Sequence, residues 1–83
     1  MLIDENWSIS IDRIRTFFAQ QPDVSVTAEG FCYRDCRVTL SEVSGEVMNR
    51  WPIPRTRVQM EGSKEDVKAI YQRFYLRFLS AGG

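Results

Sequence analysis

The sequence has no histidine and no long apolar run, and its charges cancel, because eleven bases stand against eleven acids. Without histidine it lacks the side chain that most often acts as acid or base near neutral pH. It also has no glycine-rich phosphate loop and no nucleophile elbow. No apolar stretch approaches the roughly 20 residues of a membrane span, and acids stand where a secretory signal would carry bases. We therefore expect a cytoplasmic, non-enzymatic protein with no cofactor and no membrane partner.

The length of 83 residues suits one small domain, which we expect to span residues 1–83. A content of 43% hydrophobic and 27% charged residues is typical of a globular chain. The charges are unevenly distributed, since residues 1–49 hold eight acids and four arginines, whereas residues 50–83 hold seven bases and three acids. Any anion-binding surface is therefore expected in the second part of the chain.

Cysteine is scarce, with only Cys32 and Cys36 present. A structural zinc site needs four ligands, so these two residues predict no metal site. A two-residue turn at Arg34 and Asp35 would place Tyr33 opposite Cys36 and would leave Cys32 on the other face of the hairpin. A three-residue loop would instead let the cysteines face each other and bridge. The expected cytoplasmic setting favours two free thiols.

The first predicted helix begins after Ser10 and ends near Pro22. Ser10 is a favourable N-cap, and Asp12 lies in the first turn, where the helix dipole favours a carboxylate. The apolar face of this helix consists of Ile11, Ile14, Phe17 and Phe18. Residues 7–11 also alternate between apolar and polar, so a short strand that leads into the helix is an alternative.

The last predicted helix lies in "SKEDVKAIYQRFYLRFLSAGG". Ser63 is its expected N-cap and Asp66 completes a capping box, while Gly82 and Gly83 end it. Leu76 lies about 180° around the helix from the apolar stripe and should point away from the core. The stripe consists of Val67, Ile70, Tyr71, Phe74, Tyr75, Phe78 and Leu79.

Between the helices the apolar period changes to two, which predicts three strands. The expected inward side chains are Val24, Val26 and Ala28 in the first strand, Cys36, Val38 and Leu40 in the second, and Val58 and Met60 in the third. Residues 44–54 leave room for a further short strand or an irregular flap. The predicted fold is an α+β two-layer sandwich of order α-β-β-β-α, with both helices on one face of a three-stranded antiparallel sheet.

The other face of this sheet should meet solvent and should be polar and rich in arginine, with one acid near its edge. Such a surface suits a phosphate, a carboxylate or an acidic peptide. Weak binding of nucleic acid or an acidic ligand is therefore one hypothesis. Its candidate residues are Arg37, Arg55, Arg57, Lys64 and Lys68.

The order of elements resembles that of double-stranded-RNA-binding domains. "GSKEDVK" is similar to the start of that family's basic last helix, with Gly62, Ser63, Lys64 and Lys68 in matching places. Glu65 departs from the pattern, because a second lysine is expected there. The resemblance implies contact of this helix with a nucleic-acid backbone.

The segment "NRWPIPRTR" favours a protein partner instead. Its two prolines stiffen the backbone before anything binds, so Trp51 and Ile53 are candidate anchors with a low ordering cost. Arg50 would supply a polar rim, and Leu76 would add apolar surface. The leading prediction is therefore a small domain that binds another protein or associates with itself. Packing of Trp51 onto the core is the alternative.

The final "AGG" is similar to the tails of ubiquitin-like proteins, which end in a glycine pair for carboxyl activation. Those tails follow a β-grasp strand, whereas Gly82 follows a predicted helix. On this ground we interpret Gly82 and Gly83 as a helix stop.

Overall fold

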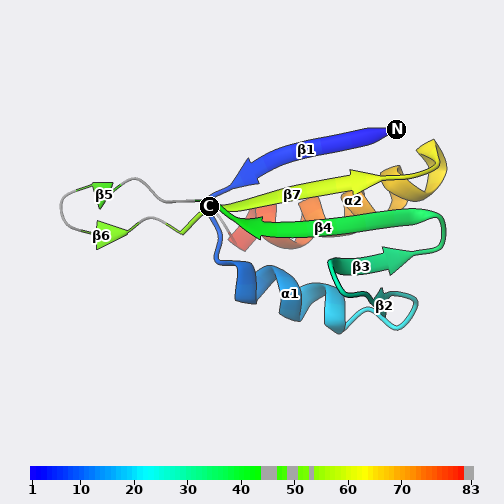
Figure 1. Cartoon of the computed structure of the whole chain (residues 1–83), viewed down its shortest axis with the longest axis horizontal. Helices are drawn as coiled ribbons and strands as arrows, with labels where there is room; N and C mark the ends of the chain where they lie inside the picture. Colours follow the sequence, from blue (N-terminus) through cyan, green and yellow to red (C-terminus); the bar gives the residue numbers. More distant parts are fainter. Residues whose placement is uncertain (44–46, 49–50, 53, 82–83) are drawn as a thin grey trace.

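The computed structural model describes residues 1–43, 47–48, 51–52 and 54–81. The elements are, in chain order, β1 (Leu2–Trp7), α1 (Ile11–Ala19), β2 (Ser25–Val26), β3 (Gly30–Tyr33), β4 (Cys36–Glu42), β5 (Val47–Met48), β6 (Trp51–Pro52), β7 (Thr56–Glu61) and α2 (Lys64–Ala81). Figure 1 shows their arrangement, with β5 and β6 beyond one end of the main sheet.

Five strands form the main sheet in the order β1-β7-β4-β3-β2, and every neighbouring pair is antiparallel. β5 and β6 pair separately, with Val47 opposite Pro52 and Met48 opposite Trp51. The segment between β4 and β7 therefore contains the extra strand that its length suggested, in the form of a small hairpin.

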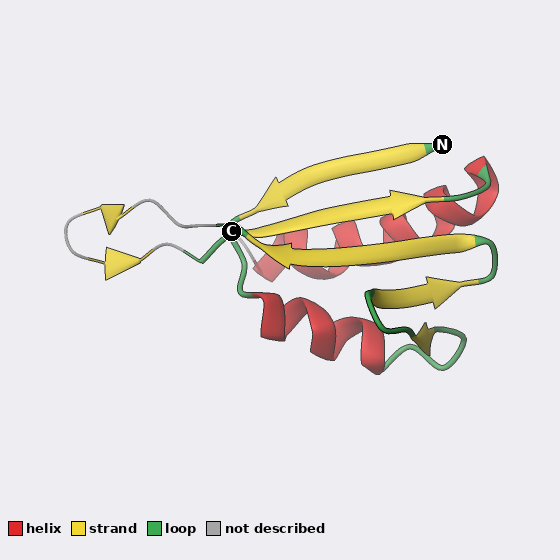
Figure 2. Cartoon of the chain, in the orientation of Figure 1, coloured by secondary structure: helices red, strands yellow, loops and turns green. Residues whose placement is uncertain are grey.

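Both helices pack on the same face of the sheet, since Phe18 of α1 stacks on Phe74 of α2 in a shared core. Figure 2 shows α2 behind the sheet. The core between the two layers holds Ile14 and Phe18 of α1 together with Val67, Ile70 and Phe74 of α2. Each fully buried side chain of this size stabilises the fold by about 1.5–3 kcal/mol relative to an exposed one. The α+β class and the placement of both helices on one face are confirmed. The predicted three strands and the α-β-β-β-α order are wrong, because a strand precedes α1 and the sheet has five strands.

The added strand β1 lies at an edge and pairs with β7 along its whole length, from Leu2 opposite Glu61 to Trp7 opposite Thr56. Its helix-facing residues Ile3 and Trp7 are half-buried and pack against the core. The expected alternative of a strand that leads into α1 is thus partly correct, but the strand ends at Trp7.

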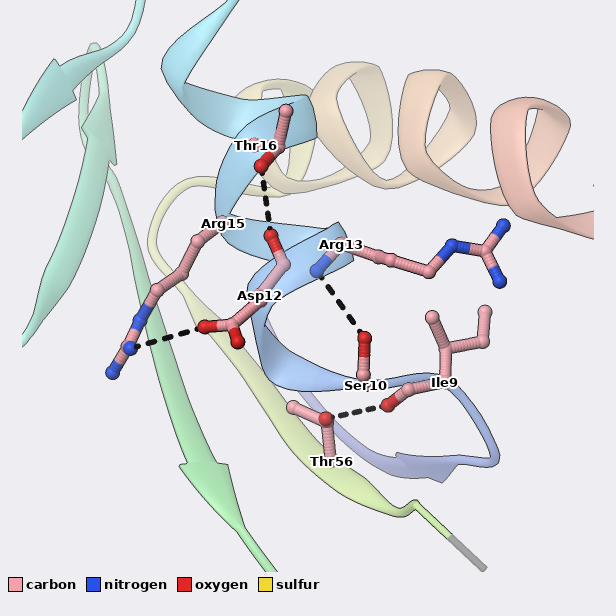
Figure 3. A network of polar contacts seen from close by, with 7 residues as sticks. All are labelled: Ile9, Ser10, Asp12, Arg13, Arg15, Thr16 and Thr56. Carbon is pink, nitrogen blue, oxygen red and sulfur yellow. Dashed lines mark hydrogen bonds and ion pairs between the residues drawn. The ribbon is translucent and has the colours of Figure 1, made fainter.

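The start of α1 is fixed by two polar contacts, which Figure 3 shows. The backbone N–H of Arg13 donates to Oγ of Ser10 over 3.4 Å, so the predicted N-cap is confirmed. The hydroxyl of Thr56, the first residue of β7, donates to the backbone carbonyl of Ile9 over 2.7 Å. Thr56 is completely buried, so this bond joins the segment before α1 to the start of β7 at a site that is closed to solvent.

The start of α2 is tied to the hairpin between β3 and β4. Oγ of Ser63 accepts from the backbone N–H of Asp66 over 3.4 Å, as an N-cap does. The Asp66 carboxylate accepts from the backbone N–H of Asp35 over 3.1 Å. A Cβ on Gly62 would lie 2.3 Å from the Asp35 carbonyl oxygen, so only glycine allows this close approach.

The first predicted strand differs most from the structure. Val26 is 73% exposed and Ala28 is also exposed, whereas Phe31 and Tyr33 of β3 are buried. Gly30 permits this arrangement, because a Cβ there would lie 2.1 Å from the Val38 carbonyl oxygen on the neighbouring strand. The large aromatic rings bury more apolar area than valine and alanine, so they take the inward positions.

Candidate functional site

The open face of the sheet carries a different charge balance from the one expected. Asp4 of β1 holds Arg57 through two bonds, from Nε over 2.9 Å and from Nη2 over 2.6 Å. The guanidinium lowers the pKa of the Asp4 carboxyl, chiefly through this hydrogen bonding. Glu61 pairs across strands with both Leu2 and Arg37, so it lies on the same face. The expectation of an arginine-rich face with one acid is wrong, because it included neither Asp4 of β1 nor Glu61 at the end of β7.

A hollow of about 630 Å³ lies on this face near the ends of β1 and β4. Its lining consists of Asp4, Asn6, Ser41, Glu42, Val43 and Arg57. The lining contains two carboxylates, of Asp4 and Glu42, and one guanidinium, of Arg57, which is already paired with Asp4. The hollow is therefore poorly suited to a phosphate or another anion.

The structure does not gather the five anion-binding candidates on one surface. Arg37 and Arg57 lie on the open face, whereas Lys64 and Lys68 lie on α2, which covers the opposite face. Arg55 lies just before β7, where its backbone carbonyl accepts from Val43 over 3.1 Å. Binding of nucleic acid or an acidic ligand stays a prediction, and no described cluster of bases supports it.

The protein-interaction candidates are only partly described. Arg50 and Ile53 lie outside the described residues, and of Trp51 only the backbone, in β6, is described. Leu76 is 60% exposed, which confirms that it points away from the core. Whether Trp51 is an anchor or a core residue stays a prediction.

The C-terminal end of α2 lies beside the connection from β1 to α1, and Trp7 joins the two. The Trp7 ring contacts Phe74 edge to face at 4.8 Å between centroids, and Tyr75 at 6.0 Å. Its indole N–H donates to the Glu5 carboxylate over 3.1 Å. The same carboxylate accepts a hydrogen bond from the Tyr71 hydroxyl over 2.8 Å. Burial and this carboxylate raise the pKa of Tyr71 to about 12, so Tyr71 keeps its proton. Aromatic contacts and hydrogen bonds thus link the end of β1 to α2.

The two cysteines are free and lie on opposite faces of the hairpin, since Tyr33 pairs with Cys36 and Cys32 pairs with Arg37. This is the two-residue-turn alternative, with Arg34 at a φ of 51°. Cys36 is buried, and desolvation raises the pKa of its thiol to about 11, so it is unsuited to nucleophilic chemistry. Among the described residues no three side chains of metal-ligating type come together. In the same part of the chain no helix is both long and apolar enough to cross a membrane.

Comparison with known proteins gives one match. A family model described as "Archaeal MoaD-like protein" matches residues 4–83, which is nearly the whole chain. A search of the curated proteins and a search of the solved structures found no match. The matched range begins at Asp4, within β1, and it extends through Gly82 and Gly83, the pair that the sequence alone indicates as a helix stop. The similarity of the final glycine pair to ubiquitin-like tails was the one signal in the sequence that pointed to this family.

Proposed function

The chain belongs to the archaeal MoaD-like family, and on this premise we propose that Gly82 and Gly83 form a tail whose carboxyl group an E1-like partner activates. MoaD-like proteins are ubiquitin-like sulfur carriers or protein modifiers, they bind E1-like activating proteins, and they are not enzymes themselves. Membership therefore shows that the chain is no enzyme, and it supports the prediction of a protein partner. It also assigns the fold to the β-grasp type found in MoaD.

The observation that carries the proposal is the extent of the match, which includes both glycines. Glycine has no side chain, so a Gly-Gly segment can enter a narrow channel and adopt backbone angles that other residues avoid. The proposal requires that Gly83 carry the free carboxyl group, whether as the last residue synthesised or after cleavage of a longer chain. Neither glycine lies within the described residues.

The chemistry of the tail follows from the low reactivity of a carboxylate. An oxygen of the Gly83 carboxylate would attack the α-phosphorus of ATP to form an acyl-adenylate, and pyrophosphate would leave. A sulfur nucleophile would then displace AMP and leave a thiocarboxylate, as in a sulfur carrier, or a lysine amine would displace AMP and form an amide, as in a modifier. Both roles share the first step, and the chain supplies only the carboxylate.

The test is intact-mass spectrometry of the chain ending at Gly83 after incubation with a purified E1-like enzyme of the same organism, ATP and a sulfide donor. We expect the mass increase produced by exchange of one oxygen for sulfur. A lysine-containing acceptor in place of sulfide tests the modifier role, which would give an amide-linked adduct.

Two variants serve as controls for the site of modification. Deletion of residues 82–83 and addition of one serine after Gly83 both move the carboxyl group, and both should abolish the mass change. Circular dichroism should show the same helix and strand content in all three chains. An unmodified parent chain, with an enzyme that activates another carrier in parallel, would refute the proposal. Equal modification of the deletion variant would also refute it.

A further inference from the structure

The last turns of α2 expose three large apolar side chains that do not take part in the core. Tyr75 is 39% exposed, Leu76 60% and Leu79 52%. Residues three and four apart are neighbours on a helix surface, so the three form one continuous surface, which we call the α2-end patch. Exposed apolar side chains gathered in this way are more typical of an interaction surface than single exposed ones.

A groove of about 200 Å³ lies next to the patch, between the end of α2 and the connection from β1 to α1. Its lining consists of Trp7, Ser8, Ile9, Phe78 and Leu79, so Leu79 belongs to both the groove and the patch. Ile9 and Phe78 are buried core residues, and the aromatic contacts with α2 hold Trp7 in place. The groove is therefore preformed and apolar, with room for one side chain.

Two arginines flank the patch and the groove. The guanidinium carbons of Arg13 from α1 and Arg77 from α2 lie 5.9 Å and 5.5 Å from the centroid of the Phe78 ring. In the described part of the chain the ion pairs involve Arg15, Arg57 and Arg73, and none involves Arg13 or Arg77. The rim beside Phe78 is thus positively charged, whereas the Glu5 carboxylate lies next to Trp7.

We propose that the α2-end patch and its groove bind an apolar side chain of the E1-like activating enzyme, with acidic residues of that enzyme facing Arg13 and Arg77. The inference rests on the proposed function, because it names the surface that holds the activating partner. α2 leads directly from the patch to Gly82, so an enzyme bound here fixes the point from which the tail starts. Fixing that point lowers the ordering cost of placing the carboxyl group.

A second copy of the chain fits this surface less well. Two patches that met face to face would bring two positive rims together, and like charges across an interface are costly. The fit of opposite charges therefore selects a partner with an acidic rim over self-association.

The experiment measures the dissociation constant of the purified E1-like enzyme by titration calorimetry. Leu76→Ser and Leu79→Ser should each weaken binding roughly 10- to 100-fold, as loss of an interface anchor does. Leu2→Ser is the matched control, because Leu2 is 61% exposed and lies on β1 away from α2, and its affinity should be unchanged. All three changes affect exposed side chains, so unchanged circular dichroism is expected.

Arg77→Glu tests the rim and should weaken binding more at low salt than at high salt. Wild-type affinity in the Leu79→Ser variant would overturn the inference. So would a dimer of the parent chain that Leu79→Ser dissociates, because the patch would then bind a second copy.

The outcome is separable from the proposed function, since the leucine variants keep Gly83 and should still be modified at saturating enzyme. A parent chain that binds through the patch but is never modified would refute the tail and leave the docking surface in place.

Discussion

Thr56→Val is the sharpest test of how the sheet holds α1. The change keeps the shape of the side chain but removes the hydroxyl that donates to the Ile9 carbonyl over 2.7 Å. Thr56 has no exposed surface, so the Ile9 carbonyl loses this donor where water cannot easily replace it. Leaving one buried polar group unsatisfied costs about 1–3 kcal/mol. For a domain of this size such a loss lowers Tm by roughly 4–24 °C.

The measurement is urea unfolding followed by tryptophan fluorescence, with a thermal scan in parallel. Thr16→Val is the matched control, since the Thr16 hydroxyl also donates to a backbone carbonyl, that of Asp12, over 2.9 Å, but at an exposed helical position. We expect the control to change the free energy of unfolding by no more than about 0.5 kcal/mol. Equal effects of the two substitutions would refute the reasoning, because burial would then not decide the cost.

Two further predictions concern titratable groups. The pKa of Asp4 is lowered in the fold by its bond to Arg57, so its contribution to stability is present above the ordinary aspartate pKa of about 3.9 and is lost as the pH falls through the lowered value. Acid unfolding of Asp4→Asn should therefore depend less steeply on pH than that of the parent chain, and equal slopes would contradict this. Cys36 is buried with a thiol pKa of about 11, so iodoacetamide at pH 8 should modify only the half-buried Cys32 in the folded chain and both cysteines in urea. Peptide mapping by mass spectrometry checks this, and fast labelling of Cys36 in the folded state would contradict it.

The sequence alone predicts correctly those elements in which the capping and turn residues and the apolar pattern agree with the side chains that are buried. Ser10 and Ser63 are favourable caps at the starts of two apolar helical stripes, and both helices form there. A two-residue turn at Arg34 and Asp35 implies a strand register that places the two cysteines on opposite faces. β3 and β4 pair in that register. In these segments capping, periodicity and packing all favour the same structure.

β1 could not be predicted in the same way, because its pattern does not alternate. Leu2 faces the open side, and Glu5 stands on the helix side, where it accepts from Trp7 and Tyr71. An acid at an inward position hides the period of two on which strand prediction depends. The strand is fixed by pairing with β7, whose residues come roughly fifty to sixty positions later in the chain, and by these hydrogen bonds. Local sequence shows neither.

The proposed C-terminal tail escaped prediction for a different reason. The apolar stripe up to Phe78 correctly indicated a helix, and a glycine pair after a helix is ordinarily a stop signal. The two interpretations of Gly82 and Gly83, as a helix stop and as the proposed tail, are compatible in one chain, and the family match favours the second one. Local propensity describes what a residue does to the backbone, whereas carboxyl activation depends on a partner that the sequence does not contain.

The position of β1 also bears on how the protein behaves at high concentration. A six-residue edge strand leaves unpaired backbone groups on which further strands can add, and this is how many sheets begin to aggregate. Asp4 and Glu5 lie in the middle of that edge, so two such edges meeting in antiparallel fashion would bring four carboxylates together. The carboxylates of Glu5 oppose strand addition by mutual repulsion, whereas Arg57 already offsets the charge of Asp4. The segment with the weakest strand signal is thus the one that helps to keep the chain in solution.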